Sequence, residues 1–223
     1  MERDAWLRDR RAAVEAAYDA EAADYDENPY PVEVQRAFVA RLLATCPPDG
    51  LVLDAPCGTG QYFPLVAVAG CRVVGIDQSA GMLEQARARG IAVDLRQVGL
   101  QELAFDREFD AVMTVDAMEN VFPEHWPGVL ANLRRALRPG GHLYLTVEEI
   151  DEAETDAAFA ALAGAGLPAV RGEVIEGDVA GYHYYPGREQ VARWVEAEGL
   201  EIVAQDTEPQ DGWAYWHLLL RGV

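Results

Sequence analysis

The sequence predicts an α/β fold: a doubly wound, mostly parallel sheet of seven strands, closed by an antiparallel C-terminal hairpin and covered by helices on both faces. Three observations lead to this prediction. Short apolar runs alternate with helical segments from residue 51 to residue 147, as in a parallel sheet with crossover helices. A turn containing Gly58 and Gly60 follows the first run. The last two runs are joined by residues 207–212 alone, which suffice for a hairpin but not for a helical crossover.

The elements follow in order from local signals. Stretches rich in Ala, Arg and Glu predict two N-terminal helices, which Pro29 and Pro31 separate. A Pro-Gly-Gly sequence at 139–141 ends the helix before the fifth strand. The expected helices are 4–24, 32–45, 62–69, 80–89, 126–137 and 188–198. The expected sheet strands are 51–54, 72–77, 91–96, 109–115, 142–147, 200–206 and 213–221. Two further short strands are expected at 173–175 and 181–185, and the acidic segment 148–156 is expected to be a loop or a helix start.

Composition limits the class of partner. The net charge is −20 in 223 residues, which argues against nucleic acids and anionic membranes because both attract basic surfaces. A small neutral or cationic substrate is compatible with this charge. The three cysteines, Cys46, Cys57 and Cys71, are not closely paired, and no export signal or membrane-spanning run is found. We therefore expect reduced thiols and a cytoplasmic location; the oligomeric state is left open.

Acidic residues end two successive strands near the glycine turn. Asp54 ends the first strand and Asp77 the second, so both lie at the edge where open α/β sheets bind ligands. Glycines let the backbone approach a ligand, and Asp77 can accept hydrogen bonds from ribose hydroxyls. Phe63 occupies the position of the third glycine of a dinucleotide fingerprint, and no P-loop Lys or flanking basic residue is present. The pattern favours a nucleoside without phosphates over NAD or a nucleoside triphosphate.

Four segments in this order resemble the class I S-adenosylmethionine-dependent methyltransferases: 52–60, 74–83, 109–121 and 133–141. The resemblance implies S-adenosylmethionine as cofactor and methyl transfer to an O, N or S atom of a small molecule. It also implies one methyltransferase domain over 1–223, with a helical lid (1–46), a cofactor-binding core (50–147), a substrate-side insertion (148–187) and a C-terminal helix and hairpin (188–223). A non-catalytic cofactor-binding module with the same fold is the alternative. No metal is expected.

The resemblance also assigns cofactor contacts. It implies that Asp54 orients the loop and the methionine amino group, that Asp77 binds the ribose, and that Asp116 faces the methionine end. The implied contacts are Tyr25, Asp54, Ala55, Gly58, Gly60, Asp77, Gln78, Met82, Leu100, Gln101, Asp116 and Ala117. The chain departs from the family at Pro56, where glycine is common, and at Gly99, where aspartate is common. Adenine recognition is therefore expected near Leu100 or on Gln101, whose amide both donates and accepts.

The acceptor side is less well defined. His183, in an aromatic cluster, is a candidate general base, or it makes a structural hydrogen bond. Glu148, at the end of the fifth strand, is a second candidate, or part of a solvated loop. The expected substrate contacts are Tyr30, Met118, Glu119, Asn120, Tyr182 and Tyr184. Asn120 is alternatively a helix cap.

Other aromatic side chains are expected to belong to the lid or to pack in the core. Tyr25 is expected to belong to the lid, whereas Tyr18 is expected to pack a helix. Alternation along the last strand sends Trp213 and Tyr215 to one face and Trp216 to the other, so core or hairpin packing is expected for them.

Overall fold

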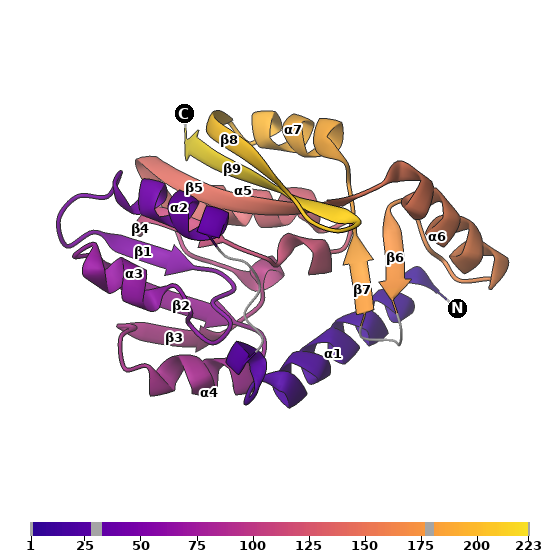
Figure 1. Ribbon diagram of the computed structural model, residues 1–223, viewed down its shortest axis with the longest axis horizontal. Helices are drawn as coiled ribbons and strands as arrows, with labels where there is room; N and C mark the ends of the chain where they lie inside the picture. Colours follow the sequence, from indigo (N-terminus) through magenta and orange to yellow (C-terminus); the bar gives the residue numbers. More distant parts are fainter. Residues whose placement is uncertain (1, 28–32, 177–180, 223) are drawn as a thin grey trace.

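Seven strands form one sheet in the computed structural model, which describes residues 2–27, 33–176 and 181–222. The strand order is β3-β2-β1-β4-β5-β9-β8 (Figure 1). Pairs from β3 to β5 are parallel, and β9 runs antiparallel to both β5 and β8. The predicted fold class is confirmed, including the antiparallel C-terminal hairpin.

The element bounds are close to those predicted. The strands of the sheet are β1 (Leu51–Asp54), β2 (Arg72–Asp77), β3 (Asp94–Gln97), β4 (Phe109–Thr114), β5 (Leu137–Ile150), β8 (Leu200–Pro209) and β9 (Trp213–Gly222). The α-helices are α1 (Arg3–Glu21), α2 (Glu33–Leu43), α3 (Phe63–Val68), α4 (Ala80–Ala88), α5 (Trp126–Ala136), α6 (Glu152–Gly164) and α7 (Arg188–Ala197). Three single turns of 3₁₀-helix are η1 (Tyr25–Glu27), η2 (Leu100–Glu102) and η3 (Met118–Asn120). None of the helices among the described residues has both the length and the apolar composition needed to cross a membrane.

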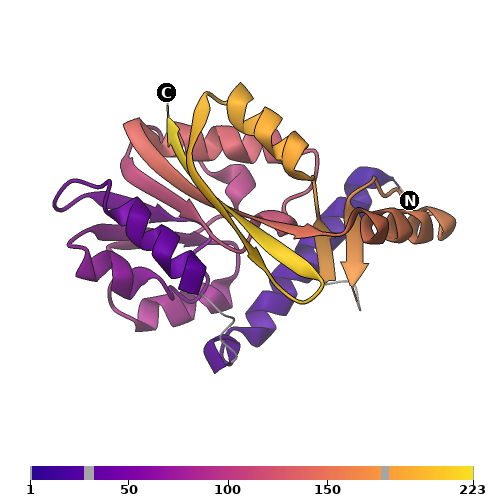
Figure 2. The same ribbon diagram turned by 45° about the horizontal axis from the view of Figure 1, so that its top comes forward.

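Helices cover both faces of the sheet because successive strand side chains point to opposite faces. On β1, Val52 packs into a cluster with residues of α2, α3 and α4, whereas Leu53 packs into a cluster with residues of α1, α5 and α7. Figure 1 shows α2 and α3 in front of the sheet, and Figure 2 shows α7 beside the C-terminal hairpin. The strand ends that carry the glycine turn therefore lie between two packed layers.

The strand boundaries that differ most from the prediction are those of β3, β5 and β8, since β5 already begins at Leu137 and β8 ends at Pro209. The third strand was expected at 91–96, but β3 begins at Asp94, where it pairs with Val74 of β2. The fifth strand continues to Ile150 because β9 pairs with it as far as the Ile150–Trp213 pair. The acidic segment after it begins α6, which Asp151 caps by accepting the backbone N–H of Ala153 at 2.8 Å.

A two-stranded antiparallel sheet, β6 (Glu173–Glu176) and β7 (Gly181–Tyr184), lies beside α1 (Figure 1). Its anchor is Glu173, whose carboxylate is fully buried. Arg3 of α1 donates to Glu173 at 2.7 and 3.0 Å, and the Tyr182 hydroxyl donates to it at 2.7 Å. The backbone N–H of Val170 adds a bond of 2.7 Å. This carboxylate therefore joins the N-terminal helix to the small sheet.

Replacing Glu173 with alanine is expected to lower the free energy of unfolding by roughly 2 kcal/mol, because Arg3 and Tyr182 lose their buried hydrogen-bond partner. Chemical denaturation followed by circular dichroism measures the change. Glu189→Ala is the matched control, since the Glu189 side chain is 94% exposed and its loss should change stability little. Equal stabilities for the two variants would contradict a structural role for Glu173.

Candidate functional site

The glycine turn after β1 is held by the acid at the end of β2. Asp77 accepts the backbone N–H of Gly58 and that of Ser79, each at 2.9 Å. Gly58 and Gly60 have φ of 51° and 78°, which side chains other than glycine rarely adopt. A Cβ on Gly60 would lie 2.6 Å from the ring of Phe63. The turn therefore exposes bare backbone at the carboxyl edge of the sheet.

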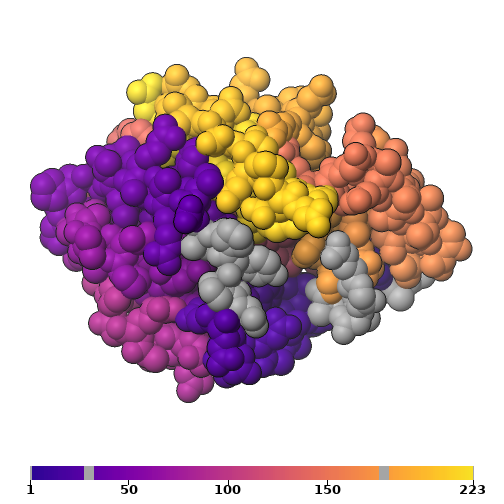
Figure 3. All heavy atoms as spheres, in the orientation of Figure 1, coloured from indigo at the N-terminus to yellow at the C-terminus, as the bar shows by residue number. Residues whose placement is uncertain are grey.

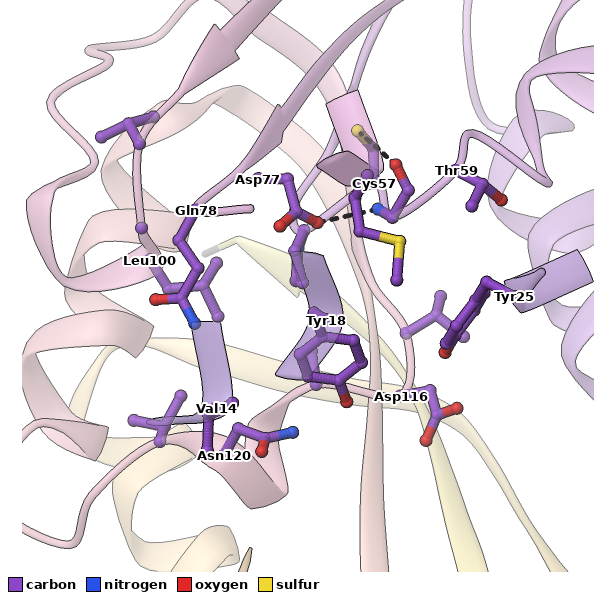
Figure 4. A pocket seen from close by; sticks show the side chains of 18 of the residues that line it. Val14, Tyr18, Tyr25, Cys57, Thr59, Asp77, Gln78, Leu100, Asp116 and Asn120 are labelled. Carbon is purple, nitrogen blue, oxygen red and sulfur yellow. Dashed lines mark hydrogen bonds between the residues drawn. The ribbon is translucent and has the colours of Figure 1, made fainter. Parts of the chain in front are cut away.

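A cavity opens at this turn, and residues from seven parts of the chain line it. Figure 4 shows Asp77 and Gln78 toward one end of the view and Asp116 and Asn120 toward the other, with Tyr18 between them. The sequence-predicted cofactor residues that line the cavity are Tyr25, Gly58, Asp77, Gln78, Met82, Leu100, Gln101, Asp116 and Ala117. Asp54, Ala55 and Gly60 are not on its wall.

Asp54 lies buried behind the turn, 1% exposed. Its Oδ2 atom has no hydrogen-bond partner among the described residues. Burial, followed by the nearby charge of Asp77, raises the pKa of Asp54 well above its ordinary value. Burial also raises the pKa of Asp77, although its backbone hydrogen bonds oppose the shift. Two carboxyl groups in this environment favour a ligand that carries positive charge and hydroxyl donors.

Helix α1 and the 3₁₀ turn after it are held over the cavity by three polar contacts. Arg11 pairs with Glu102 at 2.5 Å. Asp19 accepts the Ser79 hydroxyl at 2.5 Å. Asp26, on η1, accepts the Thr59 hydroxyl of the glycine turn at 2.7 Å. The N-terminal segment thus contacts α4, the turn and the loop after β3.

The Arg11–Glu102 pair lies close to the backbone of Gly99. A Cβ on Gly99 would lie 2.5 Å from Nη2 of Arg11 and 2.7 Å from Oε2 of Glu102. Arg11 also donates to the Gln78 side chain at 3.4 Å. A side chain at position 99 would require the flexible ends of Arg11 and Glu102 to shift. The sequence shows the departure at Gly99 but not the arginine that accompanies it.

A second cavity adjoins the first and has a volume of about 1000 Å³. Val14, Tyr18, Tyr25, Asp116 and Asn120 line both cavities. The turn of the β8–β9 hairpin contributes Asp211 and Gly212 to the second one. In Figure 3 the yellow tip of this hairpin lies at the middle of the face shown, beside the insertion at its right.

The structure brings together the two predicted catalytic candidates. Nδ1 of His183 lies 3.9 Å from Oε2 of Glu148 and 2.9 Å from the Tyr185 hydroxyl. All three residues line the second cavity. The neighbouring Glu149 does not line this cavity and pairs with Arg188 at 2.6 Å. A histidine and a carboxylate therefore lie close together in the lining of this cavity.

Three predicted substrate contacts lie away from this cavity, contrary to expectation. Tyr182 is fully buried against Trp6 and Phe122 and donates to Glu173. Tyr184 follows Tyr182 on the core-facing side of β7, and Met118 is fully buried in the same apolar cluster. Glu119 and Asn120 line the second cavity. Tyr30 lies outside the described residues.

Three residues that the sequence assigned to packing, Tyr18, Trp213 and Tyr215, instead line the cavities. The Tyr215 hydroxyl donates a short hydrogen bond to Asp116. Asp116 has φ of 53°, a left-handed conformation that turns the chain at the end of β4, and burial raises its pKa to about 6. Tyr18, expected to be a packing residue, lines both cavities, and Trp213 lines the second. Trp216 packs in the core as expected.

Residues 52–141 match the family model of a methyltransferase domain. Residues 52–141 are a methyltransferase domain. The glycine turn and the acid of β2 belong to this methyltransferase domain, whereas α1, the small sheet and the hairpin lie outside the matched residues.

Two curated relatives are similar to this chain in sequence. A malonyl-[acyl-carrier protein] O-methyltransferase of Serratia marcescens is 33% identical over 138 residues, 59% of this chain and 51% of its own. A ubiquinone biosynthesis O-methyltransferase of Dechloromonas aromatica is 36% identical over 101 residues, 43% of each chain. The chain thus spans about half the length of the curated relatives it matches.

Among solved structures, the 1,6-didemethyltoxoflavin-N1-methyltransferase of Burkholderia thailandensis has a TM-score of 0.74 at 18% identity. The match covers 100% of this chain and 91% of that one. At this identity the similarity establishes the fold. It extends beyond the methyltransferase domain to the N-terminal helices and the C-terminal hairpin.

Proposed function

We propose that the protein transfers the methyl group of S-adenosylmethionine to an O, N or S atom of a small molecule. The observation that carries the proposal is the junction of the two cavities. The first meets the glycine turn and Asp77, and the second opens beside Asp116 at the other end. A nucleoside cofactor in the first would direct its methionine end toward an acceptor in the second.

The first cavity fits the cofactor chemically. Asp77 has lone pairs beyond those used by Gly58 and Ser79, so it can accept ribose hydroxyls. Gln78, Leu100 and Gln101 would contact the adenine. The unpartnered Oδ2 of Asp54 lies in a negative region that the ammonium group of the methionine part would neutralise. When bound, S-adenosylmethionine supplies a methyl group activated by a sulfonium.

The chain's own residues would position the reactants and manage one proton. Tyr18 and Tyr25 present aromatic rings to both cavities, and such faces attract a cation. Asp116, fixed by Tyr215 and by a bond of 2.7 Å from its own N–H to Thr146, marks the junction. His183, beside Glu148, is placed to receive a proton from the acceptor. Alignment of the reactants can supply roughly 7–11 kcal/mol of the barrier reduction.

The charge of the protein supports a small-molecule acceptor. A net charge of −20 repels the phosphate backbone of nucleic acids. A volume of about 1000 Å³ in the second cavity lies at the upper end of the range for drug-sized ligands.

Calorimetry with S-adenosylmethionine, S-adenosylhomocysteine and NAD tests the proposal. We expect the first two to bind and to protect the protein from thermal unfolding, by about 2.7 kcal/mol at a hundredfold excess over Kd. NAD should give neither effect. No heat and no protection at millimolar S-adenosylmethionine would overturn the proposal. Binding without methyl transfer to any acceptor would favour the non-catalytic module instead.

A further inference from the structure

We propose that the acceptor is an organic cation, an amine with an apolar or aromatic body, and that the methyl group goes to its nitrogen. This inference rests on the proposed function and deepens it. It follows from the charge, the unpartnered polar group and the aromatic lining of the second cavity.

The lining is strongly acidic. Its carboxyl side chains are Glu21, Asp116, Glu119, Glu148, Glu154 and Asp211. Of the described residues that line the cavity, none is an arginine or a lysine. Residues 28–32 and 177–180 contain neither in the sequence. An anionic acceptor would face six carboxyl groups here, whereas a cation would be attracted from solution and held.

The side chain of Glu119 indicates that the cavity binds a ligand. It is 4% exposed and lines the cavity. Its Oε1 accepts the Asn120 amide at 3.2 Å, while Oε2 has no hydrogen-bond partner among the described residues. A buried polar atom without a partner is costly, at about 1–3 kcal/mol. An N–H donor of a ligand in the cavity would remove this cost.

The surrounding charges favour a cationic donor. Burial, followed by the charges of Asp116 and Glu148, raises the pKa of Glu119 well above its ordinary value. Three carboxyl groups therefore compete for the same positive charge near the cavity junction. An ammonium group between them would relieve both their mutual repulsion and the desolvation of Glu119. A neutral hydroxyl would supply a hydrogen bond but no charge.

Aromatic side chains complete the recognition. Tyr18, Tyr25, Tyr185, Trp213 and Tyr215 line the same cavity as the six acids. Trp213 and Tyr215 form an edge-to-face pair with ring centroids 4.8 Å apart. Aromatic faces attract ammonium groups and also pack against the apolar body of a ligand. Acids and aromatics together are the lining that an organic amine needs.

The step balances without a further reactant. The bound ammonium gives one proton to His183, which frees the nitrogen lone pair. The lone pair attacks the methyl carbon of the cofactor, an N–C bond forms and the C–S bond breaks. The electron pair of that bond returns to sulfur, so the sulfonium becomes a neutral thioether and the product is a protonated N-methylamine.

Three probes of similar shape test the charge preference: 2-phenylethylamine, 2-phenylethanol and 3-phenylpropanoate. Each is added to the whole protein saturated with S-adenosylhomocysteine, and binding is followed by calorimetry and thermal shift. Tryptamine serves as a second amine with a larger body. Mass spectrometry after incubation with S-adenosylmethionine detects methyl products. We expect both amines to bind at least tenfold more tightly than the alcohol and the acid, and to be N-methylated.

Glu119→Gln is the informative variant because it keeps the shape and removes the charge. We expect it to weaken amine binding about tenfold and to leave the affinity for S-adenosylhomocysteine unchanged. Glu152→Gln is the control, since the Glu152 side chain is 88% exposed and is not part of the second cavity; it should leave both affinities unchanged.

The outcomes separate the two proposals. Two results would overturn the acceptor inference while S-adenosylhomocysteine still binds: the alcohol or the acid is bound as tightly as the amines, or neither amine binds. Neither result would overturn the proposed function. Equal amine affinity in Glu119→Gln and in the unchanged protein would also overturn it. Failure of S-adenosylhomocysteine itself to bind would remove the proposed function first.

Discussion

Replacing Asp77 with asparagine is expected to weaken the binding of S-adenosylmethionine about 100-fold. Hydrogen bonds to a charged acceptor are each worth about 1.5–3 kcal/mol, and the carboxylate is placed to take both ribose hydroxyls while it holds the N–H groups of Gly58 and Ser79. An asparagine offers one oxygen, and its NH₂ group faces donors. A loss of about 2.7 kcal/mol corresponds to the expected factor of 100. Calorimetry with the purified variant measures it.

The control for this variant is Asp94→Asn. Asp94 lies on β3 beside β2, but its carboxylate pairs on the surface with Arg96 at 2.7 Å. Its loss should leave cofactor affinity unchanged. Circular dichroism establishes that both variants fold. A folded Asp77→Asn protein with the original affinity would show that Asp77 does not contact the ribose.

The fold could be predicted because its signals are local. Each of β1, β2 and β4 is a short apolar run that ends near a turn residue, and the connection 207–212 is too short for a crossover. The cofactor-binding residues could also be predicted from local signals, because the carboxyl ends of neighbouring parallel strands meet at one edge of the sheet. Asp77 and Asp116 could therefore be placed near one another before their contacts were known.

The acceptor side could not be predicted in this way, because it depends on register. Alternation divides Tyr182 and Tyr184 from His183 and Tyr185, but tyrosine and histidine suit either a core or a cavity. Only the packing of Tyr182 against Trp6 and Phe122 shows which side of β7 faces the core.

The place of Tyr215 in the site could not be predicted from the sequence either. Alternation correctly separated Trp213 and Tyr215 from Trp216. It did not indicate that β9 pairs Tyr215 with Glu148, which brings the Tyr215 hydroxyl to Asp116. Long-range pairing, not composition, makes this residue part of the site.

Replacing Asp54 with asparagine is expected to stabilise the empty protein and to weaken the cofactor complex. The Asp54 carboxylate is buried, and its Oδ2 has no partner among the described residues. Removing its charge should raise the free energy of unfolding by roughly 3 kcal/mol at pH 8, because a buried ion loses several kcal/mol of solvation. The same change should weaken S-adenosylmethionine about tenfold, since the methionine ammonium would lose its counter-charge.

The stabilisation by Asp54→Asn is expected to depend on pH. Because the pKa of Asp54 is raised in the folded protein, the folded state binds a proton more readily than the unfolded chain. The stability that this proton contributes is fully present below the unfolded pKa of about 3.9 and is lost as the pH rises through the folded value. The advantage of Asp54→Asn should therefore be largest at pH 8 and shrink toward pH 4.

Denaturation of both proteins at several pH values, with and without S-adenosylmethionine, separates the two effects. Taking the difference between the proteins cancels the contributions of Asp116 and Glu119, whose pKa values are raised by burial as well. Saturating cofactor should reduce the advantage of the variant, because the bound cation offsets the charge that asparagine removes. A constant difference across pH would mean that the pKa of Asp54 is the same in the folded protein and in the unfolded chain, which would contradict the prediction.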